Sequence, residues 1–195
     1  MADYEGETIF IGYFLLPSKK CEVYKKCLEL LKKKAPNLRP QKVITDYEMA
    51  MINASEWAFP TSRVQGCFFH YCQSWPSVQT NGMKKMYGKE EVKELISESM
   101  AMALLPEHLI ESVFDLLREK FRSEPSLTMH EKSKLECYFN FLKNQWLERV
   151  GSARLSMFES KARTNNYVES SNASLKKRVN SKGPNFWVFT THLSD

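Results

Sequence analysis

The chain has 195 residues, 43% of them hydrophobic, which suffices for one core with a helical annex. Its formal net charge of +5 favours a polyanionic partner such as nucleic acid, although an ordinary basic protein has the same balance. Five cysteines, without the spacing of a disulfide scaffold, indicate a reducing compartment. The apolar run 8–16 is shorter than the roughly 20 residues that span a bilayer, and acidic residues precede it, so we expect no membrane association.

The N-terminal part predicts a strand followed by a basic helix. Residues 8–16 are apolar almost throughout, which is typical of a strand covered on both faces, and residues 3–6 precede it as a turn. Ser18 is placed to cap the following helix, which residues 35–37 end. The inward positions of this helix are Tyr24, Cys27, Leu28 and Leu31. Its many lysines form either a solvated face or a DNA contact.

The next part alternates strands and helices. Residues 41–46 form a β-branched run that ends on Asp46, and a helix is expected over 47–58. A second strand over 63–68 leads into a helix with Phe69, Cys72, Trp75 and Val78 at core spacing. This alternation predicts a layered α/β domain, in which the carboxyl ends of the strands are the usual place for chemistry.

A helical block follows Gly82. Helices are expected over 90–105, from Pro106 onward, and over a third segment that Gly151 ends. The expected inward positions are Leu109, Ile110, Val113, Phe114, Leu117 and Phe121 in the second helix and Leu135, Tyr138, Phe139, Leu142 and Trp146 in the third. Residues 154–158 are expected as a short strand or loop, before a last helix over 167–179.

Three phrases together resemble one family. Residues 43–50 read VITDYEMA, residues 66–75 read GCFFHYCQSW, and residues 164–169 read TNNYVE, with PNFW at 184–187. Each phrase is weak alone, but their order and spacing cover nearly the whole chain. They resemble the Mutator-like (MULE) transposases.

The resemblance implies an α/β fold with a ribonuclease H-like core and an all-helical insertion. On this resemblance, we expect residues 1–82 to form the first part of the core, residues 83–152 the insertion and residues 153–195 the end of the core. Asp46 and Glu169 match the second Asp and the Glu of an Asp-Asp-Glu triad, which makes them the expected catalytic and metal-binding residues. Such a triad holds Mg²⁺ or Mn²⁺, hard cations that prefer oxygen ligands, for DNA strand cleavage and transfer. Cys67 and His70 match a Cys-x-x-His motif of the family.

One departure from the family pattern is serious. The first Asp of the triad belongs to a phrase like DGTF on the first strand, and no such phrase occurs here. Asp3 aligns with a turn and does not replace it. We therefore expect a truncated core of about three strands, flanked by helices, with the central first strand missing. Its neighbours must then re-pair, obtain a strand from elsewhere or form only a marginally stable fragment. The family is enzymatic, but we expect this chain alone to be catalytically incomplete. The alternative is a non-catalytic, domesticated module that binds DNA or protein.

The motif residues also have structural explanations. Asp46 is placed to act as the N-cap of the next helix, and Glu169 stands at capping-box spacing from Asn166. Cys67 and His70 either pack near the catalytic end or form half of a zinc site, for which Cys72 and His192 are the nearest further ligands.

The best candidate for DNA binding is a basic segment near the C-terminus. Residues 161–182 contain six basic residues and one acidic residue, and Arg163, Lys176, Lys177 and Arg178 are the expected contacts. Such residues bind the phosphates of DNA without recognising its sequence. The alternative is that they form a solvated face of the helix. The family also implies a nuclear location, and a homo-oligomer is possible.

Overall fold

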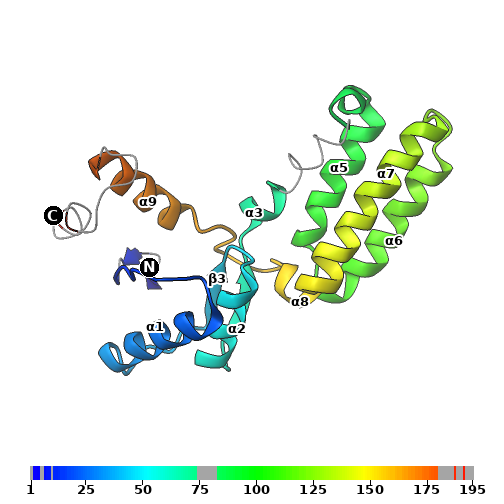
Figure 1. Cartoon of the computed structure of the whole chain (residues 1–195). Helices are drawn as coiled ribbons and strands as arrows, with labels where there is room; N and C mark the ends of the chain where they lie inside the picture. Colours follow the sequence, from blue (N-terminus) through cyan, green and yellow to red (C-terminus); the bar gives the residue numbers. More distant parts are fainter. Residues whose placement is uncertain are drawn as a thin grey trace. The chain divides into compact units, whose positions relative to one another are not determined.

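The computed structural model describes residues 2–4, 7–9, 11–73, 83–179, 187 and 191 (Figure 1). The chain divides into two compact units. One unit joins Met1–Leu15 to Asn165–Asp195, and the other is Leu16–Thr164. None of the helices in the described ranges has the length and apolar character needed to cross a membrane.

The larger unit contains a parallel βαβ arrangement. Strand β3 (Lys42–Thr45) pairs in parallel with β4 (Arg63–Gly66), in a register that sets Val43 opposite Val64. Helix α2 (Met49–Ala58) connects the two strands, because a parallel pair needs a crossover rather than a tight turn. The predicted α/β alternation is confirmed in this coarse form: the chain is mostly helical with a small two-stranded parallel sheet.

Helix α1 (Cys21–Lys34) packs on α2 through a small apolar cluster. Leu28 of α1 is buried against Ala54, Ala58 and Phe59. The expectation that Ser18 caps this helix is wrong. Lys20 occupies the N-cap position and makes no side-chain cap, so the helix starts three residues after Ser18.

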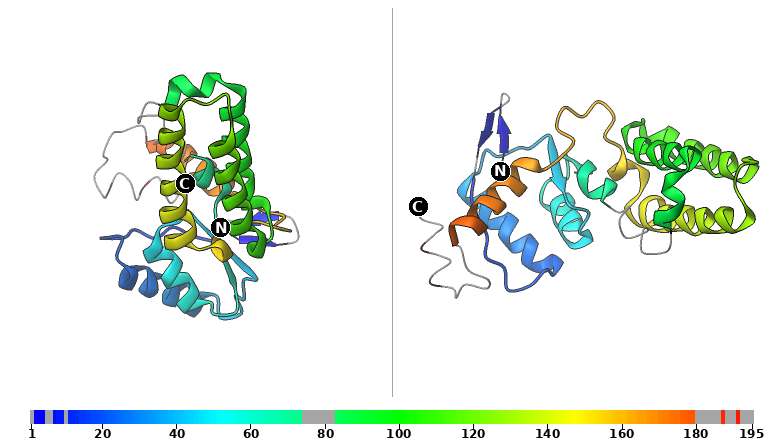
Figure 2. Two further views of the ribbon diagram at one scale, coloured as in Figure 1. Left: turned by 90° about the vertical axis from the view of Figure 1, so that its right-hand side faces the viewer. Right: turned by 90° about the horizontal axis from the view of Figure 1, so that it is seen from above.

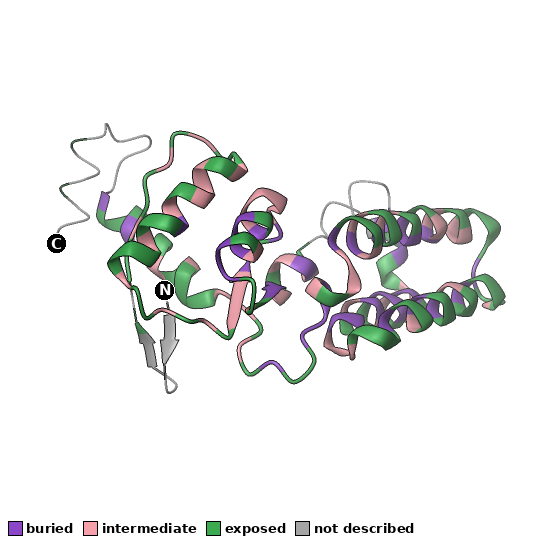
Figure 3. Cartoon of the chain, turned by 90° about the horizontal axis from the view of Figure 1, so that it is seen from below, coloured by how far each residue is buried: buried purple, intermediate pink, exposed green. Residues whose placement is uncertain are grey.

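A helical block makes up the rest of the larger unit. Helices α5 (Glu90–Ala101), α6 (Glu107–Ser123) and α7 (Met129–Leu142) lie side by side in both Figure 1 and Figure 2. Their buried faces point toward one another (Figure 3). The shorter elements are α3 (Phe68–Cys72), the 3₁₀ helices Met83–Gly88 and Met102–Leu104, a π-helix over Lys143–Val150 that continues α7, and α8 (Ser152–Leu155).

The predicted inward faces of this block are largely confirmed. All five inward positions predicted for the third helix are buried. In α6, Leu109 is 40% exposed and Val113 is half-buried, while the other predicted positions are buried. In α3, Tyr71 is buried in place of the predicted Phe69. Gly151 ends the π-helix as predicted, and part of the segment 154–158 is helical in α8. Trp75 and Val78 lie outside the described residues.

The smaller unit contains a short hairpin and one helix. Strand β1 (Ala2–Tyr4) pairs antiparallel with β2 (Glu7–Ile9), so Asp3 lies in a strand and the predicted turn placement is wrong. The strand predicted over 8–16 is also wrong beyond Ile9, because residues 11–20 have no regular structure and Ile11, Phe14 and Leu15 are exposed. Helix α9 (Asn166–Val179) is tied to the N-terminal segment by the Tyr13 and Ser171 hydroxyls, 3.2 Å apart.

The described strands are thus four short ones in two separate two-stranded sheets, where the sequence predicted about three strands of one core. A β-branched or apolar run favours extended backbone, but a strand forms only where a second strand meets its hydrogen-bonding groups.

Candidate catalytic carboxylates and nucleic-acid interface

Asp46 follows directly after β3 at the carboxyl end of the parallel sheet. Its side chain is exposed, and no hydrogen bond or ion pair of this carboxylate is found within the described ranges. The N-cap explanation for Asp46 is wrong, because α2 starts at Met49 with Glu48 in the cap position. Asp46 is therefore a solvent-facing carboxylate held at a strand end.

Glu48, two residues later, is held by α1. It accepts a hydrogen bond of 3.1 Å from the Tyr24 hydroxyl and lies 3.3 Å from Lys19 Nζ. Burial, the bond to Glu48 and the nearby carboxylates, Asp46 included, raise the pKa of Tyr24 to about 12. The Glu48 carboxylate thus has a hydrogen-bond partner and an ion-pair partner, whereas none is found for the Asp46 carboxylate among the described residues.

A segment far along the chain returns to the strands of the parallel sheet. The Phe68 N–H donates to the Arg163 carbonyl at 2.8 Å, and Arg63 Nη2 donates to the Ser156 carbonyl at 2.8 Å. Lys42 also contacts the Ser160 hydroxyl. No contact between residues 156–160 and the sheet was predicted from the sequence. The sequence of this segment shows no helical or strand periodicity, because its residues are small or of mixed polarity. Its position beside the sheet is visible only in the folded structure.

Cys67 and His70 lie at the start of α3. Cys67 is fully buried directly after β4, and His70 is half-buried one helical turn later. Burial, with a smaller contribution from Cys67, raises the pKa of the Cys72 thiol, which favours its protonated form. Within the part of the chain that the structure describes, no three His, Cys, Asp or Glu residues gather as a metal site. His192 lies outside that part.

Glu169 lies in the first turn of α9 and is half-buried. The helix already includes Asn166, and the Glu169 N–H donates to the Asn165 carbonyl at 3.2 Å. The predicted capping box needed Asn166 as the residue before the helix, so its register is wrong by one position. A carboxylate in this first turn is still favoured by the helix dipole.

The two expected metal ligands belong to different units. Asp46 lies in the larger unit and Glu169 in the smaller one. Carboxylate oxygens suit Mg²⁺ or Mn²⁺. However, the described residues assemble no set of three candidate ligands, so they do not by themselves fit a metal centre. The roles of Asp46 and Glu169 stay predictions.

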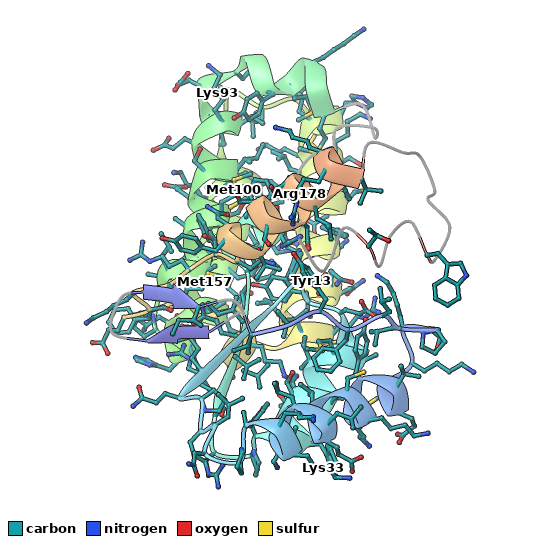
Figure 4. All side chains as sticks on the ribbon, turned by 90° about the vertical axis from the view of Figure 1, so that its left-hand side faces the viewer. Tyr13, Lys33, Lys93, Met100, Met157 and Arg178 are labelled. Atoms are coloured by element: carbon teal, nitrogen blue, oxygen red, sulfur yellow. The ribbon has the colours of Figure 1, made fainter. Side chains whose placement is uncertain are left out.

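The basic residues of α9 form an exposed set. Lys176, Lys177 and Arg178 are exposed, while Leu175 and Val179 on either side of them are buried. No acidic partner of the three basic side chains is found among the described residues. Figure 4 labels Arg178 on this helix. Leu175 and Val179 fix one face of the helix inward, so the cations between them are presented outward.

Arg163, the fourth predicted contact, belongs to the larger unit. It is exposed, and its Nε donates to the Ser160 carbonyl at 3.4 Å. The predicted DNA-binding set is therefore divided between the two units.

A second basic surface lies on α1 in the larger unit. Residues 19–39 contain eight lysines and arginines and two glutamates, a net charge of +6, whereas the whole chain carries +5. Lys20, Lys26, Lys33 and Lys34 are exposed, and Figure 4 labels Lys33 on this helix. The charge of the chain is thus concentrated in this segment and in 161–182 rather than spread evenly.

A groove of about 1100 Å³ also lies in the larger unit, between α2, α6 and α8. Arg154 and Glu56 form a two-pronged ion pair at its wall, with distances of 2.7 and 3.1 Å. None of the predicted site residues lines this groove. The predicted chemistry and the groove are therefore separate features.

The first part of the chain is similar to a known protein family. Residues 1–74 match the family model of the MULE transposase domain. No curated protein and no solved structure matches the chain. The matched region contains Asp46, Cys67 and His70, while Glu169 and the basic part of α9 lie beyond it. The resemblance to the Mutator-like transposases is thereby confirmed over residues 1–74, which are similar to the MULE transposase domain.

Proposed function

We propose that this chain is a transposase-derived, DNA-binding domain of ribonuclease H-like ancestry that grips phosphates without reading sequence. The observation that carries the proposal is the set of cations on α9, Lys176, Lys177 and Arg178, which are exposed and have no acidic partner among the described residues. The match to the MULE transposase domain supports the transposase origin.

Phosphate binding follows from the physics of such a set. Cations that are already paired with carboxylates gain little from a phosphate, whereas unpaired cations release counterions from DNA when they bind. Successive residues of a helix point about 100° apart, so three in a row cover a broad arc rather than a narrow line. Such an arc suits the backbone of DNA better than the edge of one base. The exposed lysines of α1, in the other unit, offer a second phosphate-binding surface of their own.

We propose further that strand cleavage and transfer, with Mg²⁺ or Mn²⁺, were activities of the ancestral enzyme and that this chain alone lacks them. Asp46 and Glu169 would supply two oxygen ligands, and the chemistry calls for a third. No DGTF-like phrase in the 195 residues provides it. A nuclear location is part of the same proposal, since DNA is the partner.

The DNA-binding part is tested by fluorescence anisotropy with labelled duplex DNA at several salt concentrations. The triple variant Lys176→Gln, Lys177→Gln, Arg178→Gln should weaken binding for all sequences. It should also reduce the slope of log affinity against log salt by up to about 0.9 for each lost phosphate contact. The matched control is Lys85→Gln, Lys143→Gln, Arg149→Gln, which removes the same charge from the helical block. Equal losses in both triples would contradict the proposal, because net charge alone would then explain binding.

The catalytic part is tested by adding Mn²⁺ and end-labelled DNA to the purified chain. We expect no nicking above background. Nicking that Asp46→Ala or Glu169→Ala abolishes would overturn the claim of inactivity and would assign these carboxylates a catalytic role.

A further inference from the structure

The two arginines that line the groove between α2, α6 and α8 are already engaged by the protein itself. Arg154 is held by Glu56 through the two-pronged ion pair, and Arg63 Nη2 donates to the Ser156 carbonyl at 2.8 Å. A cation that is bound in this way has little to offer an incoming anion, because the existing contact would have to be broken first. The groove is therefore not an anion site, although arginines form part of its wall.

Three carboxylates in the same lining are not engaged by cations. Glu107 and Glu111 lie one turn apart on α6, Glu159 lies after α8, and all three are exposed. No lysine or arginine of the described ranges lies within ion-pair distance of them, and the Ser152 hydroxyl is 3.5 Å from Glu111. With four glutamates and two arginines, the lining carries a net charge of −2, whereas the whole chain carries +5. The groove is thus an acidic site on a basic protein.

Apolar side chains lie between these charges. Leu147 is half-buried in the lining, and Phe158 leaves 41% of its surface exposed there. Phe158 and Glu159 form the tip of a tight turn, which the Ser160 N–H closes by donating to the Met157 carbonyl at 3.0 Å. The turn holds an aromatic ring and a carboxylate at the groove in a fixed backbone arrangement. The site therefore combines apolar contact area with unpaired negative charge.

We infer that this groove binds a segment of a basic protein in which apolar side chains alternate with lysines or arginines. Charge complementarity selects a cationic partner, because its lysines or arginines would pair with the three open carboxylates. The apolar lining selects a peptide over a simple cation, since it gives leucine-like side chains a surface to cover. The volume of about 1100 Å³ exceeds the range of about 300–1,000 Å³ that is typical of small-molecule sites. This inference does not depend on the proposed DNA binding.

The first test is the fluorescence anisotropy of a labelled peptide, KRLKLRK, titrated with the full chain in the absence of DNA. We expect saturable binding that weakens as salt is added. The triple variant Glu107→Gln, Glu111→Gln, Glu159→Gln should raise the dissociation constant about tenfold, an effect of the order of three exposed ion pairs. The matched control is Glu29→Gln, Glu91→Gln, Asp115→Asn, which changes the charge equally at exposed positions outside the groove. Absence of binding would refute the inference, as would equal losses in the two triples.

The second test separates a peptide site from a surface that attracts any cation. The peptide KRSKSRK, which has the same charge without the leucines, and spermine should each bind about tenfold more weakly than KRLKLRK. Equal affinities would overturn the inference.

NMR of the unaltered protein guards against variants that fail to fold. The amides that KRLKLRK shifts most should belong to residues 106–111 and 147–159, which include most of the lining. Shifts centred elsewhere would refute the site. A dimer of the chain that the peptide dissociates would assign the groove to a second copy, and the inferred partner would be wrong.

Discussion

The ring of Tyr47 occupies the space where a side chain at Gly66 would lie. A Cβ built on Gly66 would be 1.9 Å from both Cε1 and Cζ of Tyr47. Tyr47 reaches this place with a positive φ of 65°, which is uncommon for a residue other than glycine. Its ring also meets Trp146 edge to face, with centroids 4.7 Å apart. The residue after Asp46 thus connects the end of the parallel sheet to the helical block.

The variant Gly66→Ala should therefore destabilise the larger unit. An added methyl group at this contact forces the ring or the strand to move, and overpacking of this kind costs about 1–3 kcal/mol. The free energy of unfolding in urea measures the effect. Gly88→Ala is the matched control, because a Cβ there meets nothing within 4 Å. The double variant Gly66→Ala, Tyr47→Ala should cost less than the sum of the two single variants, and simple additivity would contradict the contact.

Any side chain at Gly151 should destabilise the larger unit through backbone strain. Its φ of 89° and ψ of 145° lie in a region that is essentially restricted to glycine, although the space around it is open. Gly151→Ala should cost about 1–3 kcal/mol through backbone strain alone. Gly151→Asn should cost about as much, because asparagine relieves strain only in the left-handed helical region. The midpoint temperatures of thermal unfolding of both variants check this prediction. A Gly151→Asn variant that is clearly more stable than Gly151→Ala would show that the backbone at this position has another conformation.

Alkaline pH should unfold the helical block through its buried tyrosines. The Tyr138 and Ser99 hydroxyls lie 2.7 Å apart, and the Tyr71 hydroxyl donates to the Ser99 carbonyl at 2.7 Å. Burial raises the pKa of Tyr138 to about 12 from an ordinary value of 10.0. A group whose pKa is raised by folding contributes its full stabilisation at pH values below its pKa in the unfolded chain. The free energy of unfolding should therefore stay constant up to about pH 10 and fall as the pH approaches 12.

Urea unfolding across this pH range measures the loss. Tyr138→Phe should lower stability by about 1 kcal/mol at neutral pH through its hydrogen bond, and should make the alkaline decline shallower. Tyr167→Phe, at an exposed position of α9, is the control and should leave the pH profile unchanged. An unaltered alkaline limb in Tyr138→Phe would contradict the prediction.

The start of α7 should give the block an acid-sensitive contact. Thr128 and Glu131 form a capping box, and Lys89 Nζ lies 2.9 Å from the Glu131 carboxylate. The bond to Lys89, followed by those to Thr128, lowers the pKa of Glu131 to about 2 from 4.5. A group whose pKa is lowered by folding contributes its full stabilisation at pH values above its pKa in the unfolded chain. The contribution of Glu131 to the free energy of unfolding is therefore complete above about pH 4.5 and is lost as the pH falls toward 2.

Two substitutions separate the cap from the charge. Thr128→Ala removes the cap and should cost about 1 kcal/mol at neutral pH. Glu131→Gln keeps a capping-box residue but loses the charge, so it should flatten the stability profile below pH 4.5. Circular dichroism during acid titration records both, with Glu148→Gln as the surface control. If the stability of Glu131→Gln falls below pH 4.5 as steeply as that of the unaltered chain, the prediction is wrong.

Much of the architecture could be predicted from sequence because local patterns carry it. The β-branched run at β3 and the turn residues between elements indicate the βαβ unit. Helical periodicity located the buried positions of α7, from Leu135 to Trp146. Periodicity works there because one face of each helix must be buried whichever neighbour covers it.

The candidate site was predictable only in part. The phrases around Asp46 and Cys67 located the strand ends to within two residues, and the exposed cations of α9 lie on a helix as expected. The caps assigned to Ser18, Asp46 and Asn166 were wrong, because a helix start depends on contacts of the whole turn and shifts by a few residues at little cost.

By itself, the sequence determined the resemblance to the MULE transposase domain over residues 1–74, the helical faces and the concentration of charge in two segments. Only the tertiary structure decided that residues 11–16 are not a strand and that residues 156–163 return to β4. The physical reason is that side-chain periodicity is local, whereas each backbone group of a strand is satisfied by a partner whose position along the chain no local pattern specifies.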